Sequence, residues 1–299
     1  MTRQLLLVHG RAQEKKDSVA LKAEWLDALH DGLAKSNLSL PIREEDVRFP
    51  FYGDTLYDMV EGKSRADAAR VIVRGEGIDN GEKDFTRAIL QEVQEKAGIT
   101  DAEIAAELGT NVVNRGPLNW EWLQAILKVI DRKVPHGSGE SIALFTHDVY
   151  QYLKNSGIRD AIDEGVAGAM TPGVETVVVS HSLGTVVAYN VLRQRGSAAG
   201  WKVPLFVTVG SPLAVTEIRK SIQKPIQCPE CAAGWFNAMD ERDVVALYPL
   251  DTRQFRLAPP DPAIQNKKNV RNKTENRHGI AGYLDDQEVA ARIYNALVR

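Results

Sequence analysis

The stretch VVVSHSLGTVVAYNVL, residues 177–192, decides the fold and holds the first candidate functional residue. It begins with three β-branched valines, which predict a buried strand, and continues with apolar residues typical of a mostly buried helix. Ser182 lies between the two, on the turn from strand to helix. Small residues stand two positions to either side, at Ser180 and Gly184, where a sharp strand-to-helix turn leaves little room for side chains. The pattern therefore predicts a tight turn with Ser182 on it.

This stretch resembles the GxSxG nucleophile elbow of the α/β-hydrolases, with Ser180 where that pattern has its first glycine. The resemblance covers most of the chain outside residues 55–141 and points toward esterase and lipase-like members. It implies an α/β-hydrolase fold and makes Ser182 the candidate nucleophile.

Strand-like and helix-like segments alternate along most of the chain, which predicts a doubly wound, mostly parallel sheet in a single α/β domain over residues 1–299. Asp17 is placed to cap the first helix. The expected strands are 4–10, 175–179, 204–209 and 234–239, with another near 253–256, and residues 46–54 are expected to form a second strand and the turn that leaves it. The expected helices are 17–36, 146–169, 183–194 and 286–298.

The alternation stops over residues 55–141, which we interpret as an inserted helical cap or lid. Helices are expected around 84–97, 101–108 and 119–132, and Thr100 and Glu103 form a capping box before the second. The third has an apolar face, which predicts either packing against the domain beneath it or a lid over an acyl pocket. That face consists of Trp120, Leu123, Ile126, Leu127 and Ile130, with Trp122 toward its flank.

The composition narrows the class of partner. The 37 basic and 40 acidic residues give a net charge of −3, and no long basic run is present, so a nucleic-acid partner is not expected. The N-terminal apolar run is too short for a signal peptide or a membrane span, so we expect a cytoplasmic protein without an integral membrane segment. The sequence leaves the oligomeric state open.

A serine hydroxyl is a weak nucleophile unless a base removes its proton and an acid orients that base. In α/β-hydrolases the acid and then the histidine follow the serine along the chain. Of the six histidines, only His278 follows Ser182. His278 is therefore the candidate base, in a glycine-containing loop just before the last helix.

The candidate acids follow the segment at 234–239, in the stretch NAMDERDVVA. Loops at the carboxyl ends of parallel strands are where catalytic groups gather. The stretch resembles the N..D..DPVA segment of esterase and lipase-like α/β-hydrolases, and FVTVGSPL before it resembles their preceding strand. By that resemblance Asp243 is the acid, and Asp240 is the alternative.

The negative charge that develops on the substrate oxygen needs N–H donors. The backbone N–H of Leu183, directly after Ser182 at the start of a helix, is one candidate. VHGRA after the first strand resembles the HG turn of lipases and esterases, and this implies that the backbone of Arg11 is the second, with Gly10 permitting close approach.

Both cysteines, Cys228 and Cys231, lie in one CPEC stretch, and we interpret them as reduced thiols in a loop. A disulfide and a partial metal site are the alternatives, although two ligands do not complete a tetrahedral site.

Together these residues predict a serine hydrolase that cleaves a carboxylic ester, small or lipid-like, without a metal or organic cofactor. A thioesterase, an amidase and an acyltransferase would use the same three residues, and a non-catalytic partner-binding protein of the same fold is a further alternative.

Overall fold

The computed structural model of the chain describes residues 3–10, 17–52, 79–108, 120–133, 139–259 and 263–298. Its centre is a six-stranded sheet in the order β2-β1-β3-β4-β5-β6, in which every neighbouring pair is parallel. The strands are β1 (Gln4–Val8), β2 (Val47–Arg48), β3 (Thr176–His181), β4 (Phe206–Val209), β5 (Trp235–Ala238) and β6 (Gln265–Lys267). The predicted α/β class with a parallel sheet is confirmed.

Helices connect most of the strands and cover the sheet. Those beside the sheet are α1 (Ser18–Ala34), α7 (Gly139–Lys154), α8 (Ser156–Gly168), α9 (Leu183–Arg195), α10 (Thr216–Ser221), α11 (Ala281–Leu284) and α12 (Gln287–Val298). A 3₁₀ turn, Glu44–Asp46, precedes β2. Asp17 caps α1, as the sequence predicts, by accepting a hydrogen bond from the N–H of Val19 at 3.0 Å.

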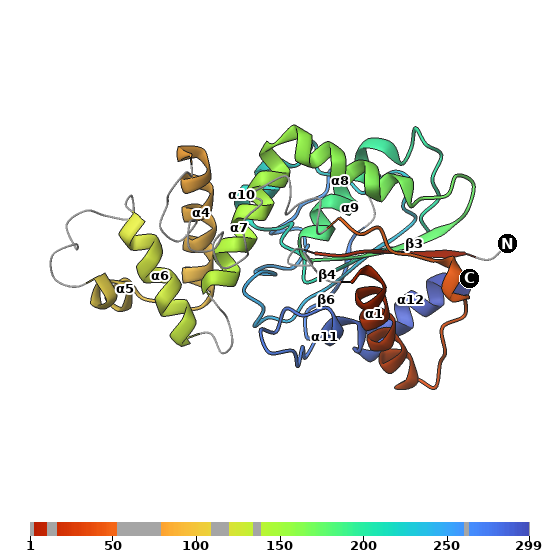
Figure 1. Cartoon of the computed structure of the whole chain (residues 1–299), viewed down its shortest axis with the longest axis horizontal. Helices are drawn as coiled ribbons and strands as arrows, with labels where there is room; N and C mark the ends of the chain where they lie inside the picture. Colours follow the sequence, from red (N-terminus) through yellow and green to blue (C-terminus); the bar gives the residue numbers. More distant parts are fainter. Residues whose placement is uncertain are drawn as a thin grey trace.

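The two faces of the sheet carry different helices because successive side chains of a strand point to opposite sides. Leu5 and Leu7 of β1 pack with α1, α11 and α12, whereas Leu6 and Val8 pack with the helices of the other face, α7 to α9 among them. Figure 1 shows the sheet nearly edge-on between these layers, with α8 and α9 above it and α1 and α12 below. The four inner strands, β1, β3, β4 and β5, are therefore buried on both faces.

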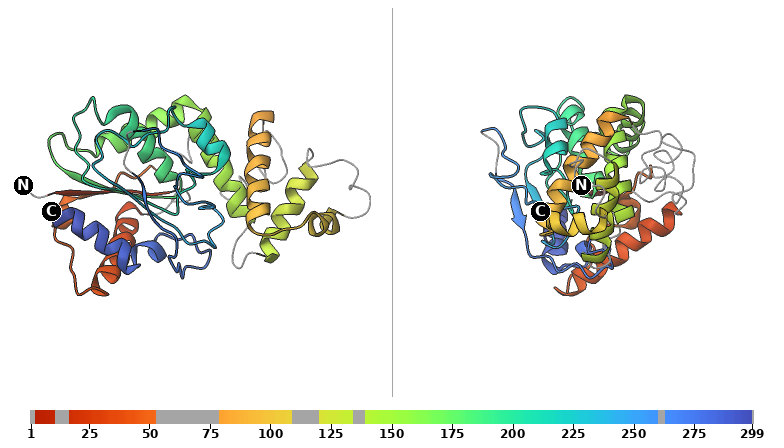
Figure 2. Two further views of the ribbon diagram at one scale, coloured as in Figure 1. Left: turned by 180° about the vertical axis from the view of Figure 1, so that it is seen from behind. Right: turned by 90° about the vertical axis from the view of Figure 1, so that its left-hand side faces the viewer.

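A helical region lies beyond one end of the sheet, where Figures 1 and 2 place α4 to α6. It contains α4 (Asn80–Lys96), α5 (Asp101–Leu108) and α6 (Trp120–Lys133). The predicted capping box is present before α5, where Glu103 Oε2 accepts from the Thr100 N–H at 2.7 Å. The apolar side chains of α6 from Trp122 to Ile130 are buried, and α6 packs against α4, α5 and α7. These side chains therefore pack against the neighbouring helices, the side chain of Trp120 lies outside the described ones, and the lid over an acyl pocket stays a prediction.

Two predicted elements are wrong. The long helix expected over 146–169 is two helices, because the chain breaks at Asn155, whose backbone is extended. The strand expected near 253–256 is a turn, held by Asp251 Oδ1, which accepts hydrogen bonds from the N–H groups of Arg253 and Gln254. The sixth strand lies further on, at β6, a short edge strand whose exposed and half-buried polar residues give no hydrophobic signal.

Among the described helices, none combines the length and the apolar composition that a bilayer-spanning segment needs.

Candidate functional site

The candidate site lies where the chain changes direction across the sheet. From β1 the chain goes outward to β2 on one side, and it returns to β3 on the other side of β1. The carboxyl ends of β1 and β3 therefore diverge into connections on opposite faces, and such a switch point is the usual ligand site of an open parallel sheet. β1 ends at Val8, just before His9 and Gly10, and β3 ends at His181, just before Ser182.

Ser182 has a strained backbone on the turn between β3 and α9. Its φ of 56° and ψ of −132° lie where residues other than glycine are rarely found, at a typical cost of about 1–3 kcal/mol. The turn is held from both sides. The Ser182 N–H donates to the Val209 carbonyl at 3.2 Å, and its own carbonyl accepts from the Thr185 N–H at 2.9 Å. The sheet thus fixes this serine in a conformation that a free turn would not keep.

The small residues two positions to either side of Ser182 leave the space that the turn needs. A Cβ at Gly184 would lie 2.3 Å from the His9 carbonyl oxygen and 2.5 Å from that of Val8. The backbone at the end of β1 therefore limits the space at position 184. Ser180 fits inside the sheet because its hydroxyl donates to the Val207 carbonyl at 3.0 Å, so this position does not require glycine.

The three residues that the sequence predicts for the triad lie in one hydrogen-bonded chain. Ser182 Oγ is 2.8 Å from His278 Nε2, and His278 Nδ1 is 2.7 Å from Asp243 Oδ2. The Asp243 side chain is fully buried, whereas 15% of the His278 side chain is exposed. The carboxylate of Asp243 thus lies at the buried end of this row of hydrogen bonds, and the imidazole of His278 is partly exposed to solvent.

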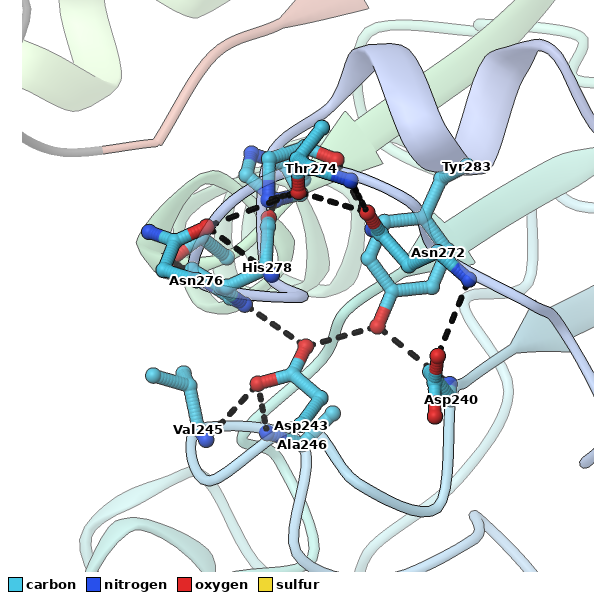
Figure 3. A network of polar contacts seen from close by, with 12 residues as sticks. Asp240, Asp243, Val245, Ala246, Asn272, Thr274, Asn276, His278 and Tyr283 are labelled. Carbon is cyan, nitrogen blue, oxygen red and sulfur yellow. Dashed lines mark hydrogen bonds and ion pairs between the residues drawn. The ribbon is translucent and has the colours of Figure 1, made fainter. Parts of the chain in front are cut away.

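Asp243 accepts hydrogen bonds on both oxygens (Figure 3). Oδ1 accepts from the N–H groups of Val245 at 2.8 Å and Ala246 at 3.3 Å, while Oδ2 accepts from His278 and from the Tyr283 hydroxyl at 2.6 Å. Burial by itself would raise the pKa of Asp243, but the charge of His278 and these hydrogen bonds outweigh it and lower the pKa. The group therefore stays an anion beside the imidazole.

Asp240, the alternative acid, has different partners. Its Oδ1 accepts from Arg242 Nε at 2.8 Å, and its Oδ2 accepts from the Asn272 N–H at 2.9 Å. Burial would raise the pKa of Asp240, but the hydrogen bonds from Arg242 and Asn272 lower it. Asp240 thus anchors the start of the loop that carries His278, and Asp243 is the carboxylate that meets the imidazole.

The loop that carries His278 is closed by its own side chains (Figure 3). The Asn272 amide donates to the Gly279 carbonyl at 2.9 Å and accepts from the Thr274 N–H at 3.0 Å. The Gly279 N–H donates to the Thr274 hydroxyl at 2.9 Å, and the His278 N–H donates to Asn276 Oδ1 at 3.1 Å. This network holds the loop in one conformation, so the position of the imidazole does not depend on the Ser182 contact alone.

His181, next to Ser182, supports the same loop. Its Nε2 donates to the His278 carbonyl at 2.7 Å, and the two rings lie 4.7 Å apart between centroids. Burial, followed by the charge of His278, lowers the pKa of His181 to about 3, so this ring is neutral at physiological pH.

On the other side of Ser182, Gly10 approaches so closely that a Cβ there would lie 2.7 Å from the Ser182 Cβ. His9 is buried and neutral, since burial lowers its pKa to about 4. Its Nε2 accepts from the Tyr52 N–H at 3.1 Å, so Nδ1 carries the proton and donates to the Gly10 carbonyl at 2.7 Å. Arg11, the predicted second oxyanion donor, lies outside the described residues.

Leu183, the predicted first donor, is the first residue of α9. Its N–H is therefore one of the four at a helix start that have no acceptor within the helix. It directly follows Ser182, at the positive end of the helix dipole.

The other predicted groups lie apart from this chain of hydrogen bonds. Cys228 is buried, Cys231 is half-buried, and neither forms a disulfide. Within the described ranges, no group of three or more His, Cys, Asp or Glu side chains is placed to hold a metal ion.

Sequence reasoning missed five supporting residues: Tyr283, Asn272, Thr274, Asn276 and, in its role as an anchor, Asp240. Tyr283 carries no recognisable signal, because an aromatic residue in a short apolar segment is typical of a core position. The asparagine and threonine between 272 and 276 are the residues that fold loops through local side-chain hydrogen bonds, and this composition is the one signal that could have indicated the closed loop.

No protein-family model matches this sequence, and a search of the curated proteins finds no match.

Proposed function

We propose that this protein is a serine hydrolase of the α/β-hydrolase superfamily that cleaves a carboxylic ester through an acyl-enzyme on Ser182. The observation that carries the proposal is the continuous chain from Ser182 Oγ to His278 Nε2 at 2.8 Å and from His278 Nδ1 to Asp243 at 2.7 Å. A nucleophile bonded to a base that is oriented by a buried carboxylate is the arrangement that activates a hydroxyl. It lies at the switch point of the sheet, on a strained turn, and both features support a catalytic role.

In the proposed reaction, Ser182 Oγ attacks the ester carbonyl carbon while His278 Nε2 takes its proton. The tetrahedral intermediate then expels the alkoxide, which receives that proton from His278, and the acyl group remains on Ser182. Water attacks the acyl-enzyme with His278 again as base, and the carboxylic acid leaves as Ser182 recovers its proton. Asp243 stabilises the imidazolium in both steps and keeps the proton of the neutral ring on Nδ1.

The oxyanion of each intermediate would be stabilised by the Leu183 N–H at the start of α9 and by the turn after β1, where Gly10 leaves room beside Ser182. We assign the second donor to the backbone of Arg11, as the resemblance to the HG turn implies.

The substrate is proposed to be a small or lipid-like ester. The helices α4 to α6 lie beyond the end of the sheet toward which the strands run (Figure 1), where a cap would cover the entrance to the site. The same triad would serve transfer from a thioester or an amide, or to an acceptor other than water. A panel of nitrophenyl esters of increasing chain length, with the matching thioesters and anilides, would rank these reactions by kcat/KM.

Covalent labelling tests the proposal directly. A fluorophosphonate probe is expected to label the wild-type protein and to leave Ser182→Ala unlabelled, because the probe reacts with an activated serine hydroxyl. Ser156→Ala is the matched control, since Ser156 is an exposed serine at the start of α8. Peptide mapping by mass spectrometry would locate the adduct.

Two outcomes would contradict the proposal. Label on a serine other than Ser182 would remove the assignment of the nucleophile. A folded protein that is neither labelled nor active on any acyl substrate would favour the partner-binding alternative, in which Ser182→Ala leaves binding intact.

A further inference from the structure

Tyr283 lies at the inner end of the hydrogen-bonded chain, on α11, five residues after His278. It is fully buried, and its hydroxyl lies between the two aspartates that follow β5. The hydroxyl oxygen accepts from the Asp240 N–H at 3.3 Å. An amide can only donate and a carboxylate can only accept, so the hydroxyl proton is directed to Asp243, where the distance to Oδ2 is 2.6 Å.

The Asp243 oxygen that receives this proton is the one that also receives the His278 Nδ1–H, at 2.7 Å. One carboxylate oxygen thus shares its negative charge between two donors, and both bonds are short (Figure 3). A second donor on a shared acceptor reduces the charge available to the first. The hydroxyl therefore weakens the attraction between the carboxylate and a protonated imidazole, while it holds the carboxylate plane in place.

We propose that Tyr283 is a positioning residue that, through the Asp243 oxygen it shares with His278, sets the pH range over which His278 can accept the Ser182 proton. The inference rests on the proposed function for its catalytic consequence, but not for the hydrogen bonding itself. Burial, and then the charge of Asp243, raises the pKa of Tyr283, so the hydroxyl remains a donor throughout the working range.

The hydroxyl can be separated from the packing of the ring. The Tyr283 ring belongs to the core between the sheet and α1, α11 and α12, and its centroid lies 6.0 Å from that of His181. Phenylalanine would fill the same space. Asp243 would keep its two backbone donors on Oδ1, so the carboxylate would not be left unsatisfied. Tyr283→Phe therefore removes the shared hydrogen bond, together with the longer one from the Asp240 N–H, while the core retains its shape.

Among the described residues, the titratable groups next to the Asp243–His278 pair keep their charge near neutral pH. From β3, His181 faces His278, and it is neutral because burial lowers its pKa to about 3. From the loop after β5, Asp240 is ion-paired with Arg242, and its lowered pKa keeps that pair intact at neutral pH. A shift in the pH profile of the variant would therefore report on the Asp243–His278 pair.

The first experiment compares the pH dependence of kcat/KM for p-nitrophenyl acetate in the wild type, Tyr283→Phe and Tyr189→Phe. Tyr189 is the matched control, a buried tyrosine whose hydroxyl donates to the Gln227 carbonyl at 3.0 Å. In Tyr283→Phe the midpoint of the acid limb is expected to move up by about 0.5–1 pH unit, because the less shared carboxylate favours protonated His278. We expect kcat to fall by about 3–10-fold and KM to change little, as for a loss of transition-state orientation. Tyr189→Phe is expected to leave the profile unchanged.

The second experiment needs no turnover. The ring proton signals of His278, assigned by their loss in His278→Gln, are followed against pH by NMR in the same proteins. The protonation midpoint is expected to move upward in Tyr283→Phe and to stay in place in Tyr189→Phe. If the wild type and both variants lack esterase activity but the protonation midpoint of His278 still moves in Tyr283→Phe, the proposed function fails. The effect of the Tyr283 hydroxyl on His278 through Asp243 then still stands.

An unmoved midpoint in Tyr283→Phe, with or without a loss of kcat, would show a merely structural residue and overturn the proposal. Incorporation of 3-fluorotyrosine at position 283 provides a test that does not depend on the stability of the phenylalanine variant. Its more acidic hydroxyl is a stronger donor, so the midpoint is expected to move downward, and a movement upward would also overturn the proposal.

Discussion

At the scale of single residues, the candidate site depends on backbone contacts that leave no room for a side chain. The positive φ of Ser182 turns the backbone away from the direction of β3. The same turn brings Gly184 into close contact with the carbonyl groups of Val8 and His9. These are main-chain atoms at the carboxyl end of β1, so they cannot move aside as the end of a flexible side chain would. The position of the nucleophile is thus determined by how closely α9 approaches β1.

Gly184→Ala is predicted to destabilise the protein by about 3 kcal/mol and to abolish most labelling of Ser182, because its Cβ would overlap two backbone oxygens. Gly165→Ala is the matched control. Gly165 lies exposed within α8, where an added Cβ would meet nothing within 4 Å, and alanine there should stabilise the helix by up to about 1 kcal/mol. Urea unfolding of both variants measures the difference, and equal stabilities would refute the argument.

At the scale of elements, the break between α7 and α8 changes the architecture that the hydrophobic pattern predicts. The pattern continues across the break, but Asn155 has an extended backbone, with φ −95° and ψ 107°. Its side chain accepts from the N–H groups of Gly157 at 3.0 Å and Ile158 at 3.3 Å, which makes it the N-cap of α8. The break lets α7 run toward α4 and α6 while α8 stays against α9.

Asn155→Ala is predicted to lower the free energy of unfolding by about 1 kcal/mol, because two N–H groups at the start of α8 lose their acceptor. Asn155→Asp should retain the stability of the wild type, since a carboxylate accepts the same hydrogen bonds and is favoured at a helix N-terminus. Chemical denaturation followed by circular dichroism tests this pair. Equal losses in the two variants would show that the cap does not hold the break.

At the scale of the whole molecule, one buried carboxyl group connects the helices on one face of the sheet. Asp163 of α8 accepts from the Tyr152 hydroxyl of α7 at 2.7 Å, and that hydroxyl accepts from the Asn190 amide of α9 at 3.3 Å. Burial raises the pKa of Asp163 from 3.8 to about 6. The folded protein therefore binds this proton more tightly than the unfolded chain does. The free energy of unfolding is thus higher at low pH, where Asp163 is protonated, than at neutral pH, where Asp163 is ionised.

Asp163→Asn is predicted to be more stable than the wild type by up to about 3 kcal/mol at pH 7 and above, with no gain below about pH 4. In the wild type this contribution is present below the unfolded pKa and is lost as the pH rises through about 6, where the folded group ionises. Asparagine keeps the hydrogen bond to Tyr152 without a charge. The test is the free energy of unfolding of both proteins between pH 4 and 8. A difference that does not grow with pH would contradict the prediction.

The sequence by itself determined the features that depend on local pattern and on order along the chain. Alternating buried strands and amphipathic helices predict the parallel sheet, because each periodicity reflects the backbone geometry of its own segment. The turn at Ser182 is predicted because a run of valines meets an apolar helix-like segment there. His278 is predicted as the base because it is the sole histidine after that serine. These inferences need no knowledge of distant contacts.

Only the tertiary structure decided which aspartate meets the imidazole, because Asp240 and Asp243 are three residues apart in the same loop and have the same chemistry. Asp240 accepts hydrogen bonds from Arg242 and from the N–H of Asn272, which lies 32 positions further along the chain. Asp243 is instead placed between His278 and Tyr283, which come from the loop and the helix after β6. The resemblance of NAMDERDVVA favours Asp243, but the hydrogen bonds that choose between the two aspartates join segments far apart in sequence, so the physical reason for the choice is not contained in the local residues.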